Sequence, residues 1–359
     1  MRHSTFVNAF GVITLAFLTR SASAQRGRIV VDTISSASLR NLLGAPPRAR
    51  ISVYLPPSYA SAPTRRYPVI YLLHGFGSAD TEWTNAASDR GMGGRDIRGM
   101  IDSLVAVGAA REMIVVMPNG SNRFGGSFYV NSYTTGNWED FISHELIAYV
   151  DARYRTLPRP ESRGIAGVSM GGFAALYYGM RHGGATFGAL YAMSACCTSP
   201  LPVDPVPLFD AAWDTLASLR SFAALARRSG LVRVLAAEAA AFAPDSSKPP
   251  LFFSVRQERH KGVVSVNRAV AKEWDDHIPL LMVSRSRANL LQMRAVQFDV
   301  GAQDEAVPPV ELMRLDTALT RAAIPHTFEL FEGTHTSRIT ERLATRLLPF
   351  FSRALVFMR

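Results

Sequence analysis

A serine set between two glycines is the residue in this sequence best placed to do chemistry. The segment Gly167-Val168-Ser169-Met170-Gly171 joins an apolar, strand-like run to a helix-like one. This pattern places a serine on a tight strand-to-helix turn, where the positions two before and two after must lack side chains for the backbone to pass. The following helix directs its N-terminal amides at developing negative charge. The pattern therefore predicts Ser169 as a nucleophile.

A serine hydroxyl needs a base to take its proton and an acid to hold that base. With this kind of turn the expected order along the chain is serine, acid, histidine. Asp304 and His335 follow in that order, each in a loop just after an expected strand. We predict Asp304 as the acid and His335 as the base. Asp299 and Glu305 remain alternative acids.

The chain has eight histidines, so the base must be chosen among them. Four of the others are expected in helices and one precedes a strand: His144, His182, His260, His277 and His326. His335 is the histidine expected in a loop after a late strand, at the edge where Ser169 should lie.

The oxyanion formed in acyl transfer needs two backbone donors. The amide of Met170 is the first. For the second we predict the amide of Phe76, in a glycine-flanked turn after a strand, with Gly77 as the alternative. His74 precedes this turn, and we expect it to shape the loop rather than act as a base.

Strand-like and helix-like stretches alternate through most of the chain, which predicts an α/β fold with a mainly parallel central sheet flanked by helices. The expected strands are Ile51 to Leu55, Pro68 to Leu73, Met113 to Met117, Gly164 to Val168, Gly188 to Met193, Ala295 to Val300 and Thr327 to Phe331. The expected helices are Asp96 to Ala110, Trp138 to Arg155, Met170 to Arg181, Pro309 to Ala323 and Ser337 to Ala354.

Residues 198–292 interrupt this alternation. The segment begins rich in proline and then shows helix-like runs at Ala211 to Arg228, Leu231 to Phe242 and around Trp274. An insertion before the acid-bearing strand is expected near the carboxyl ends of the strands, where sites form in such folds. We predict a helical lid or cap, the alternative being a structural bundle packed away from the site.

The first 24 residues have the layout of a secretory signal: a short basic start, an apolar run from Ala9 to Leu18, and Ala22-Ser23-Ala24 before Gln25. We therefore expect a mature domain of residues 25–359, secreted or periplasmic. No later apolar stretch reaches the length of a membrane span.

The formal net charge is +10, and arginine supplies most of the positive charge. These charges are scattered rather than gathered in a stripe with aromatic residues, so we do not expect a nucleic-acid partner. The only cysteines are the neighbours Cys196 and Cys197. We expect two small buried residues. A disulfide between them would be strained, because neighbouring Cα atoms lie about 3.8 Å apart, below the usual disulfide range.

Several blocks of the sequence together resemble the putative-esterase family of α/β-hydrolases, which includes esterase D-like enzymes, secreted feruloyl and acetyl esterases, and mycolyltransferases. The blocks are Tyr71 to Gly77 with Trp83 downstream, Val115 to Gly120, Ser127 to Tyr129, Trp138 to Tyr154, Gly164 to Ala175, Asp299 to Asp304 and Gly333 to His335. The resemblance implies the α/β-hydrolase fold, a Ser169, Asp304 and His335 triad, and ester chemistry without metal or cofactor.

These observations lead to a hypothesis of two-step hydrolysis of a small or carbohydrate-linked ester through an acyl-enzyme on Ser169. Acyl transfer to a sugar or lipid alcohol is the alternative, and a serine peptidase or a non-catalytic binding module is a more distant one. Trp83 and Phe76 are candidate substrate contacts, as are Trp213 and Phe252 of the insertion, although each could equally serve packing. The sequence does not define the oligomeric state.

Overall fold

A computed structural model describes residues 26–85, 96–201, 207–228, 230–260 and 263–358. The expected signal segment, residues 1–24, and its cleavage site lie outside the described residues.

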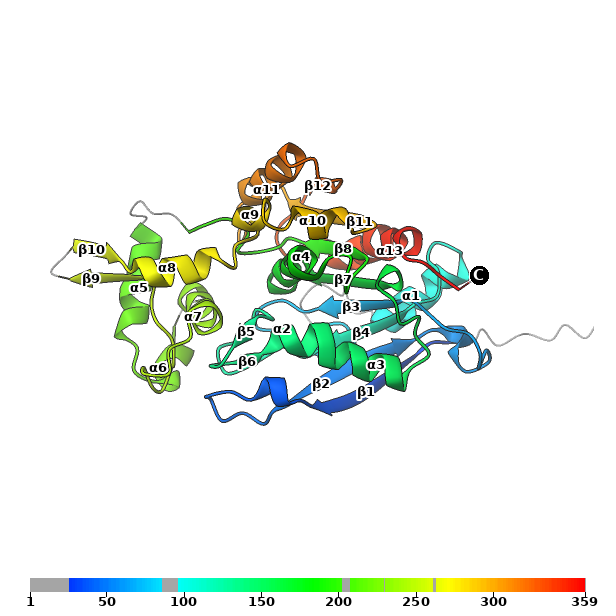
Figure 1. Ribbon diagram of the computed structural model, residues 1–359, viewed down its shortest axis with the longest axis horizontal. Helices are drawn as coiled ribbons and strands as arrows, with labels where there is room; N and C mark the ends of the chain where they lie inside the picture. The colour runs from blue at the N-terminus through cyan, green and yellow to red at the C-terminus, as the bar shows by residue number, and fades with distance from the viewer. Residues whose placement is uncertain (1–25, 86–95, 202–206, 229, 261–262, 359) are drawn as a thin grey trace, which may run out of the picture.

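An eight-stranded sheet forms the centre of the molecule (Figure 1). Its strands in spatial order are β1 (Arg28–Ser35), β2 (Arg48–Leu55), β4 (Ile114–Pro118), β3 (Val69–Leu73), β7 (Arg163–Val168), β8 (Ala189–Met193), β11 (Ala295–Gly301) and β12 (Thr327–Phe331). The pairs β1–β2 and β2–β4 are antiparallel, and all other neighbours run parallel. The mainly parallel sheet is therefore confirmed, and β1 is an edge strand that was not predicted.

Both faces of the sheet are covered, which explains the uninterrupted apolar runs. In β3, Val69, Tyr71 and Leu73 belong to one core cluster, whereas Ile70 and Leu72 belong to the cluster on the opposite face. Burying each such aliphatic side chain stabilises the fold by about 1.5–3 kcal/mol. A parallel sheet inside two helical layers requires this kind of sequence.

The two helical layers come from different parts of the chain. One layer holds the helix that runs from α2 (Trp138–Asp140) through a π-helical stretch (Phe141–Leu146) into α3 (Ile147–Arg153), together with α4 (Met170–His182) and α11 (Pro309–Arg321). The other holds α1 (Ile97–Ala106), α12 (Ile339–Arg342), a π-helical stretch (Leu343–Leu347) and α13 (Leu348–Ala354).

The chain leaves the carboxyl end of β8 to form a lobe beside the sheet, which we call the cap (Figure 1). The cap, residues 207–275, consists of α5 (Pro207–Ser218), α6 (Phe222–Ala226), α7 (Gly230–Phe242), a hairpin of β9 (Gln257–His260) and β10 (Val263–Val266), and α8 (Arg268–Asp275).

The insertion differs from the sequence-based prediction in three respects. The helix expected over Ala211 to Arg228 is divided, because Ser221 begins a new helix by accepting a hydrogen bond from the Ala224 amide. The β9–β10 hairpin was not predicted. Finally, α9 (Pro279–Met282) and α10 (Arg287–Leu291) lie outside the cap and pack against α4.

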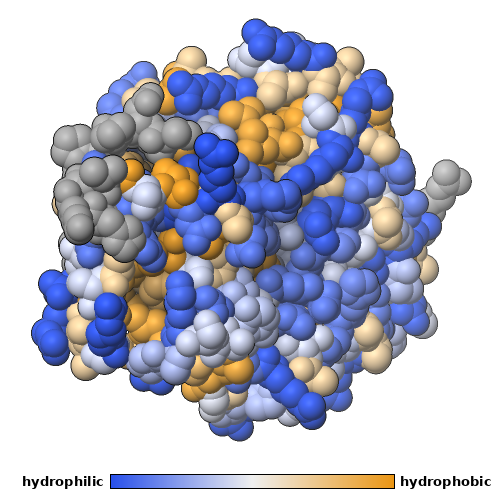
Figure 2. Space-filling model, turned by 60° about the vertical axis from the view of Figure 1, so that its left-hand side comes forward, coloured by the Kyte–Doolittle hydropathy of each residue, from blue (hydrophilic) through white to orange (hydrophobic). Residues whose placement is uncertain are grey.

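Aromatic side chains attach the cap to the body. The ring of Phe242 in α7 lies 5.5 Å from Phe128 and 5.6 Å from Phe173 of α4. Trp213 and Trp274 are also buried, with their ring centroids 5.5 Å apart. Seen from the cap side, the surface is mostly hydrophilic, with its hydrophobic residues in separate patches (Figure 2). The large aromatic residues of the cap are thus used for internal packing.

Candidate active site

Ser169 lies on a strained turn between β7 and α4. Its backbone has φ 55° and ψ −115°, a conformation that is costly for any residue with a side chain. The surrounding structure holds it there. The Ser169 amide donates to the Met193 carbonyl (2.9 Å), and the Ser169 carbonyl accepts from the amides of Phe173 (2.8 Å) and Cys196 (3.3 Å). A strained serine at the carboxyl end of a central strand is the geometry of an exposed nucleophile.

The two flanking glycines are required by close backbone contacts. A Cβ atom on Gly167 would lie 2.4 Å from the carbonyl carbon of Gly171, and one on Gly171 would lie 2.2 Å from the carbonyl oxygen of Leu73. Both distances are far below van der Waals contact. The turn can therefore pass only with glycine at these positions, which is the physical reason for the sequence pattern.

His335 and Asp304 meet at the same edge of the sheet. The Nδ1 atom of His335 lies 3.0 and 2.9 Å from the two carboxylate oxygens of Asp304. The Asp304 side chain is fully buried and also accepts hydrogen bonds from the amides of Ala306 (3.0 Å) and Val307 (2.7 Å). Because the carboxylate can only accept, we assign the imidazole proton to Nδ1, which leaves Nε2 as the basic nitrogen.

The alternative acids have other partners. Asp299 is buried in β11, where it forms an ion pair with Arg342 and accepts a hydrogen bond from the Tyr191 hydroxyl (2.8 Å). Burial raises the pKa of Asp299. Glu305 is exposed and accepts from the backbone amide of His335 (3.2 Å), not from its ring. Of the three carboxylates, only Asp304 holds the imidazole.

Among the side chains that the structure describes, no histidine other than His335 lines the cavity at Ser169. His182 and His326 each contact a carboxylate elsewhere, at 2.7 and 3.0 Å, and His144 lies in the π-helical stretch Phe141–Leu146. Two placements from the sequence were wrong: His260 ends strand β9, and His277 follows α8 rather than lying within a helix. The hairpin at 257–266 accounts for the first error, because β9 is a run of only four polar residues and carries no period-2 pattern.

The loop after β3 is held by a neutral histidine. The Nδ1–H of His74 donates to the Gly75 carbonyl (2.8 Å), and its Nε2 accepts from the Gly120 amide (2.9 Å). Burial lowers the pKa of His74 to about 4, so the ring is uncharged near neutral pH. His74 thus joins two loops and is not a lining residue of the cavity. This agrees with the sequence-based expectation that it shapes the loop.

The two predicted oxyanion donors both belong to segments next to Ser169. Met170 is the first residue of α4, and amides in the first turn of a helix have no acceptor within the helix. The Gly77 amide donates to the Gly125 carbonyl (2.8 Å), which argues against Gly77 as a donor. Phe76 lines the cavity at Ser169. The amides of Phe76 and Met170 remain our prediction.

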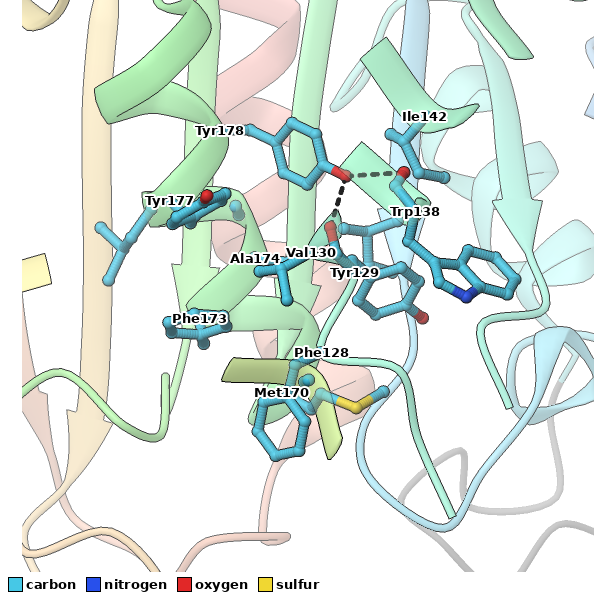
Figure 3. Packing of buried hydrophobic residues seen from close by; sticks show 14 of the residues in the cluster. Phe128, Tyr129, Val130, Trp138, Ile142, Met170, Phe173, Ala174, Tyr177 and Tyr178 are labelled. Carbon is cyan, nitrogen blue, oxygen red and sulfur yellow. Dashed lines mark hydrogen bonds between the residues drawn. The ribbon is translucent and has the colours of Figure 1, made fainter. Parts of the chain in front are cut away.

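Buried aromatic packing fixes the helix that carries Met170. The rings of Phe128 and Phe173 pack against each other with their centroids 6.0 Å apart, and the Tyr178 hydroxyl donates to the backbone carbonyls of Tyr129 (2.7 Å) and Trp138 (3.1 Å) (Figure 3). These two hydrogen bonds connect α4 to the loop that contains Tyr129 and to the start of α2. The packing and these hydrogen bonds hold α4, whose first residue is Met170, against the neighbouring loop and α2.

A cavity of about 170 Å³ opens at Ser169. It is lined by Gly75, Phe76, Ser78, Glu82, Val168, Ser169, His335, Thr336 and Ile339. The structure thus brings Ser169, His335 and Phe76 to one space. No described residue of the cap lines it, so the predicted lid role of the insertion has no contact to support it.

Glu82 is the one acidic residue among the described lining residues, and it was not predicted from the sequence. Its side chain is buried, and one carboxylate oxygen lies 3.4 Å from the Gly75 amide. The available signal was its place immediately before Trp83, in the block that follows the oxyanion loop. Trp83, predicted as a substrate contact, is instead fully buried in the core beside α1 and does not line the cavity. Glu82 and Trp83 are neighbours at the end of the short 3₁₀ helix Asp80–Glu82, so a shift of one residue exchanges their positions.

Comparison with known proteins agrees with this geometry. The family model described as Putative esterase matches residues 46–339, and the chain belongs to this family. The structure also resembles a solved ferulic acid esterase, with a TM-score of 0.61 at 25% identity over 92% of this chain and 99% of that chain. The α/β-hydrolase fold and the membership of an esterase family are thereby confirmed.

Two curated relatives match only part of the chain. Esterase Rv1288 of Mycobacterium tuberculosis (strain ATCC 25618 / H37Rv) is 34% identical over 135 residues, which are 37% of this chain and 26% of that protein. The endo-1,4-beta-xylanase/feruloyl esterase of Xylanibacter ruminicola is 34% identical over 127 residues, which are 34% of this chain and 16% of that protein. The matched region is therefore about a quarter or less of each relative.

Proposed function

We propose that this protein hydrolyses a small carboxylic ester through an acyl-enzyme on Ser169. One observation carries the proposal: Ser169, on its strained turn, shares a cavity with His335, whose Nδ1 is held by the buried carboxylate of Asp304. These are the parts that an acyl-transfer mechanism needs.

The reaction proceeds in two stages. His335 Nε2 removes the Ser169 proton as the hydroxyl attacks the ester carbonyl, and the amides of Phe76 and Met170 stabilise the oxyanion. The imidazolium, stabilised by Asp304, then protonates the departing alcohol. Water activated by the same imidazole releases the acid and restores Ser169.

The size of the cavity favours a short acyl group. Its volume of about 170 Å³ is below the ~300–1,000 Å³ usual for drug-sized ligands. An acetyl-type ester is therefore our first choice. A feruloyl-type ester is the second, supported by the resemblance to a ferulic acid esterase and by a relative named a feruloyl esterase.

We also propose that the protein is exported, on the basis of the signal-like segment at residues 1–24. Among the described residues, no helix is sufficiently long and apolar to traverse a bilayer. Expression of the full chain in a bacterial host, followed by N-terminal sequencing, tests this proposal. Processing near Gln25 supports it, and an intact Met1 in a cytoplasmic product contradicts it.

The test of the activity uses p-nitrophenyl acetate, p-nitrophenyl butyrate and methyl ferulate with the wild type and Ser169→Ala. We expect Ser169→Ala to lose activity toward all of them. Ser265→Ala, at an exposed cap position, is the matched control and should keep full activity. Product analysis with an added sugar alcohol separates hydrolysis from acyl transfer. Unchanged turnover by Ser169→Ala would show that the nucleophile lies elsewhere.

A further inference from the structure

A pair of thiols lies between the nucleophile turn and the cap. Cys196 and Cys197 follow β8 at the start of the insertion, and their sulfur atoms are 3.0 Å apart. That separation is only about 1 Å longer than a disulfide bond of about 2.05 Å. Both residues are partly exposed, which corrects the expectation that they are small buried residues. Part of each residue therefore meets solvent, although the Cys197 thiol itself is buried.

The backbone presents the two sulfurs to each other. Cys197 has a positive φ of 57°, and this turn brings its side chain toward that of Cys196. The Cys196 amide donates to the Ser169 carbonyl (3.3 Å), so the pair is joined directly to the nucleophile turn.

A buried carboxylate completes the group. The Cys197 thiol donates to Oε1 of Glu238, 2.8 Å away, on cap helix α7. Burial raises the pKa of Glu238 to about 7, so near neutral pH a large fraction of the carboxyl is ionised and can accept a proton. Burial also raises the pKa of the Cys197 thiol, which therefore needs a base to become a nucleophile. Glu238 is the side chain in contact with that thiol that can act as the base.

We propose that Cys196 and Cys197 are a site of reversible oxidation to a vicinal disulfide, with Glu238 as the base and a small-molecule disulfide as the oxidant. The proposed ester hydrolysis assigns no role to these three side chains.

The chemistry proceeds by two thiol–disulfide exchanges. The Cys196 thiolate attacks one sulfur of the reagent RSSR, the S–S bond of the reagent breaks, and RS⁻ leaves with the proton lost by Cys196. Glu238 then takes the Cys197 proton. The Cys197 thiolate attacks the Cys196 sulfur, expels the second RS⁻, and that thiolate receives the proton from Glu238. In total, two electrons pass from the cysteines to RSSR, which becomes two RSH.

Closure of the ring has consequences on both sides of the pair. It removes the hydrogen-bond donor from Glu238, a buried residue of the cap, and it constrains the amide that contacts Ser169. Neighbouring Cα atoms are closer than in ordinary disulfides, so the ring is strained and easily reduced. The site should therefore respond reversibly to the ratio of thiol to disulfide around the protein.

The test measures the intact mass and the thiol content of the full chain after exposure to oxidised glutathione at neutral pH. We expect the wild type to lose two hydrogens, about 2 Da, and to resist iodoacetamide, without carrying glutathione. Dithiothreitol should reverse both the loss of mass and the resistance to iodoacetamide. A stable glutathione adduct on the wild type, or two cysteines that remain free, would overturn the proposal.

Three variants assign the roles. Cys197→Ser should stop at a glutathione adduct on Cys196, whereas Cys196→Ser should react slowly. Glu238→Gln keeps the shape and an acceptor oxygen but cannot take the proton. We expect ring closure in this variant to be at least about tenfold slower, with accumulation of the adduct, because general bases contribute about 10²–10⁴-fold. If Glu238→Gln formed the disulfide at the wild-type rate, Glu238 would not be the base. Circular dichroism verifies that each variant is folded, and no measurement depends on ester hydrolysis.

Discussion

Replacing Asp304 by asparagine tests the arrangement of the base with little change in shape. The asparagine oxygen can still accept the amides of Ala306 and Val307, now 3.0 and 2.7 Å from Asp304, so the loop should keep its structure. The new amide nitrogen, however, donates to His335 Nδ1. The ring proton must then lie on Nε2, which can no longer accept the proton of Ser169.

The size of the effect follows from this exchange of tautomers. Loss of the correct tautomer in a serine triad lowers kcat about 10⁴-fold, or about 5.5 kcal/mol of transition-state stabilisation. Glu305 cannot compensate, because it contacts the backbone amide of His335 at 3.2 Å and not the ring.

The assay is kcat/KM for p-nitrophenyl acetate, and the neighbouring variant Glu305→Gln is the matched control. We expect Asp304→Asn to lose about 10³–10⁴-fold and Glu305→Gln to remain within about threefold. If Asp304→Asn kept a tenth or more of the activity, or if Glu305→Gln fell as far as Asp304→Asn, the assignment of the acid would be refuted.

Three further predictions concern stability and are checked by urea unfolding. Gly167→Ala should lower the free energy of unfolding by about 3 kcal/mol or more, since its Cβ would lie 2.4 Å from a backbone carbon, whereas Gly230→Ala, with open space around it, should change it by less than about 1 kcal/mol; equal effects would contradict the steric argument. Arg342→Met should cost about 3–5 kcal/mol because it leaves the Asp299 carboxylate buried without its cation, and a loss under about 1 kcal/mol would contradict this. The folded-state pKa of His74 is about 4, below the ordinary 6.5, so the stability contributed by the neutral ring is present above pH 6.5 and is lost as the pH falls toward 4; wild type should therefore lose more stability over that range than His74→Gln, and parallel curves would show that His74 titrates normally.

The central sheet, and the meeting of Ser169, Asp304 and His335 at one of its edges, could be predicted because their signals are local. A strand buried on both faces is apolar throughout, as in Val69–Leu73, and a tight turn demands glycine at fixed positions around Ser169. Asp304 and His335 each follow such a strand, so the topology alone carries both to one edge.

The features missed by the sequence analysis depend on contacts between distant parts of the chain. Strand β1 pairs only with β2 and is largely exposed, so its residues show no continuous apolar run. The exchange of Glu82 for Trp83 at the cavity depends on the direction of a single short turn. The meeting of Cys197 with Glu238 joins residues 41 positions apart, and no sequence pattern indicates it.

Ser169 is the residue that becomes acylated in the proposed reaction. The most direct measurement is treatment of the protein with a serine-directed phosphonate, followed by proteolysis and mass spectrometry of the peptides. We predict one phosphonate per chain, on Ser169, with hydrolysis of p-nitrophenyl acetate lost in proportion to labelling. A label on another residue, or full labelling of Ser169 with hydrolysis unchanged, would show that Ser169 is not the nucleophile.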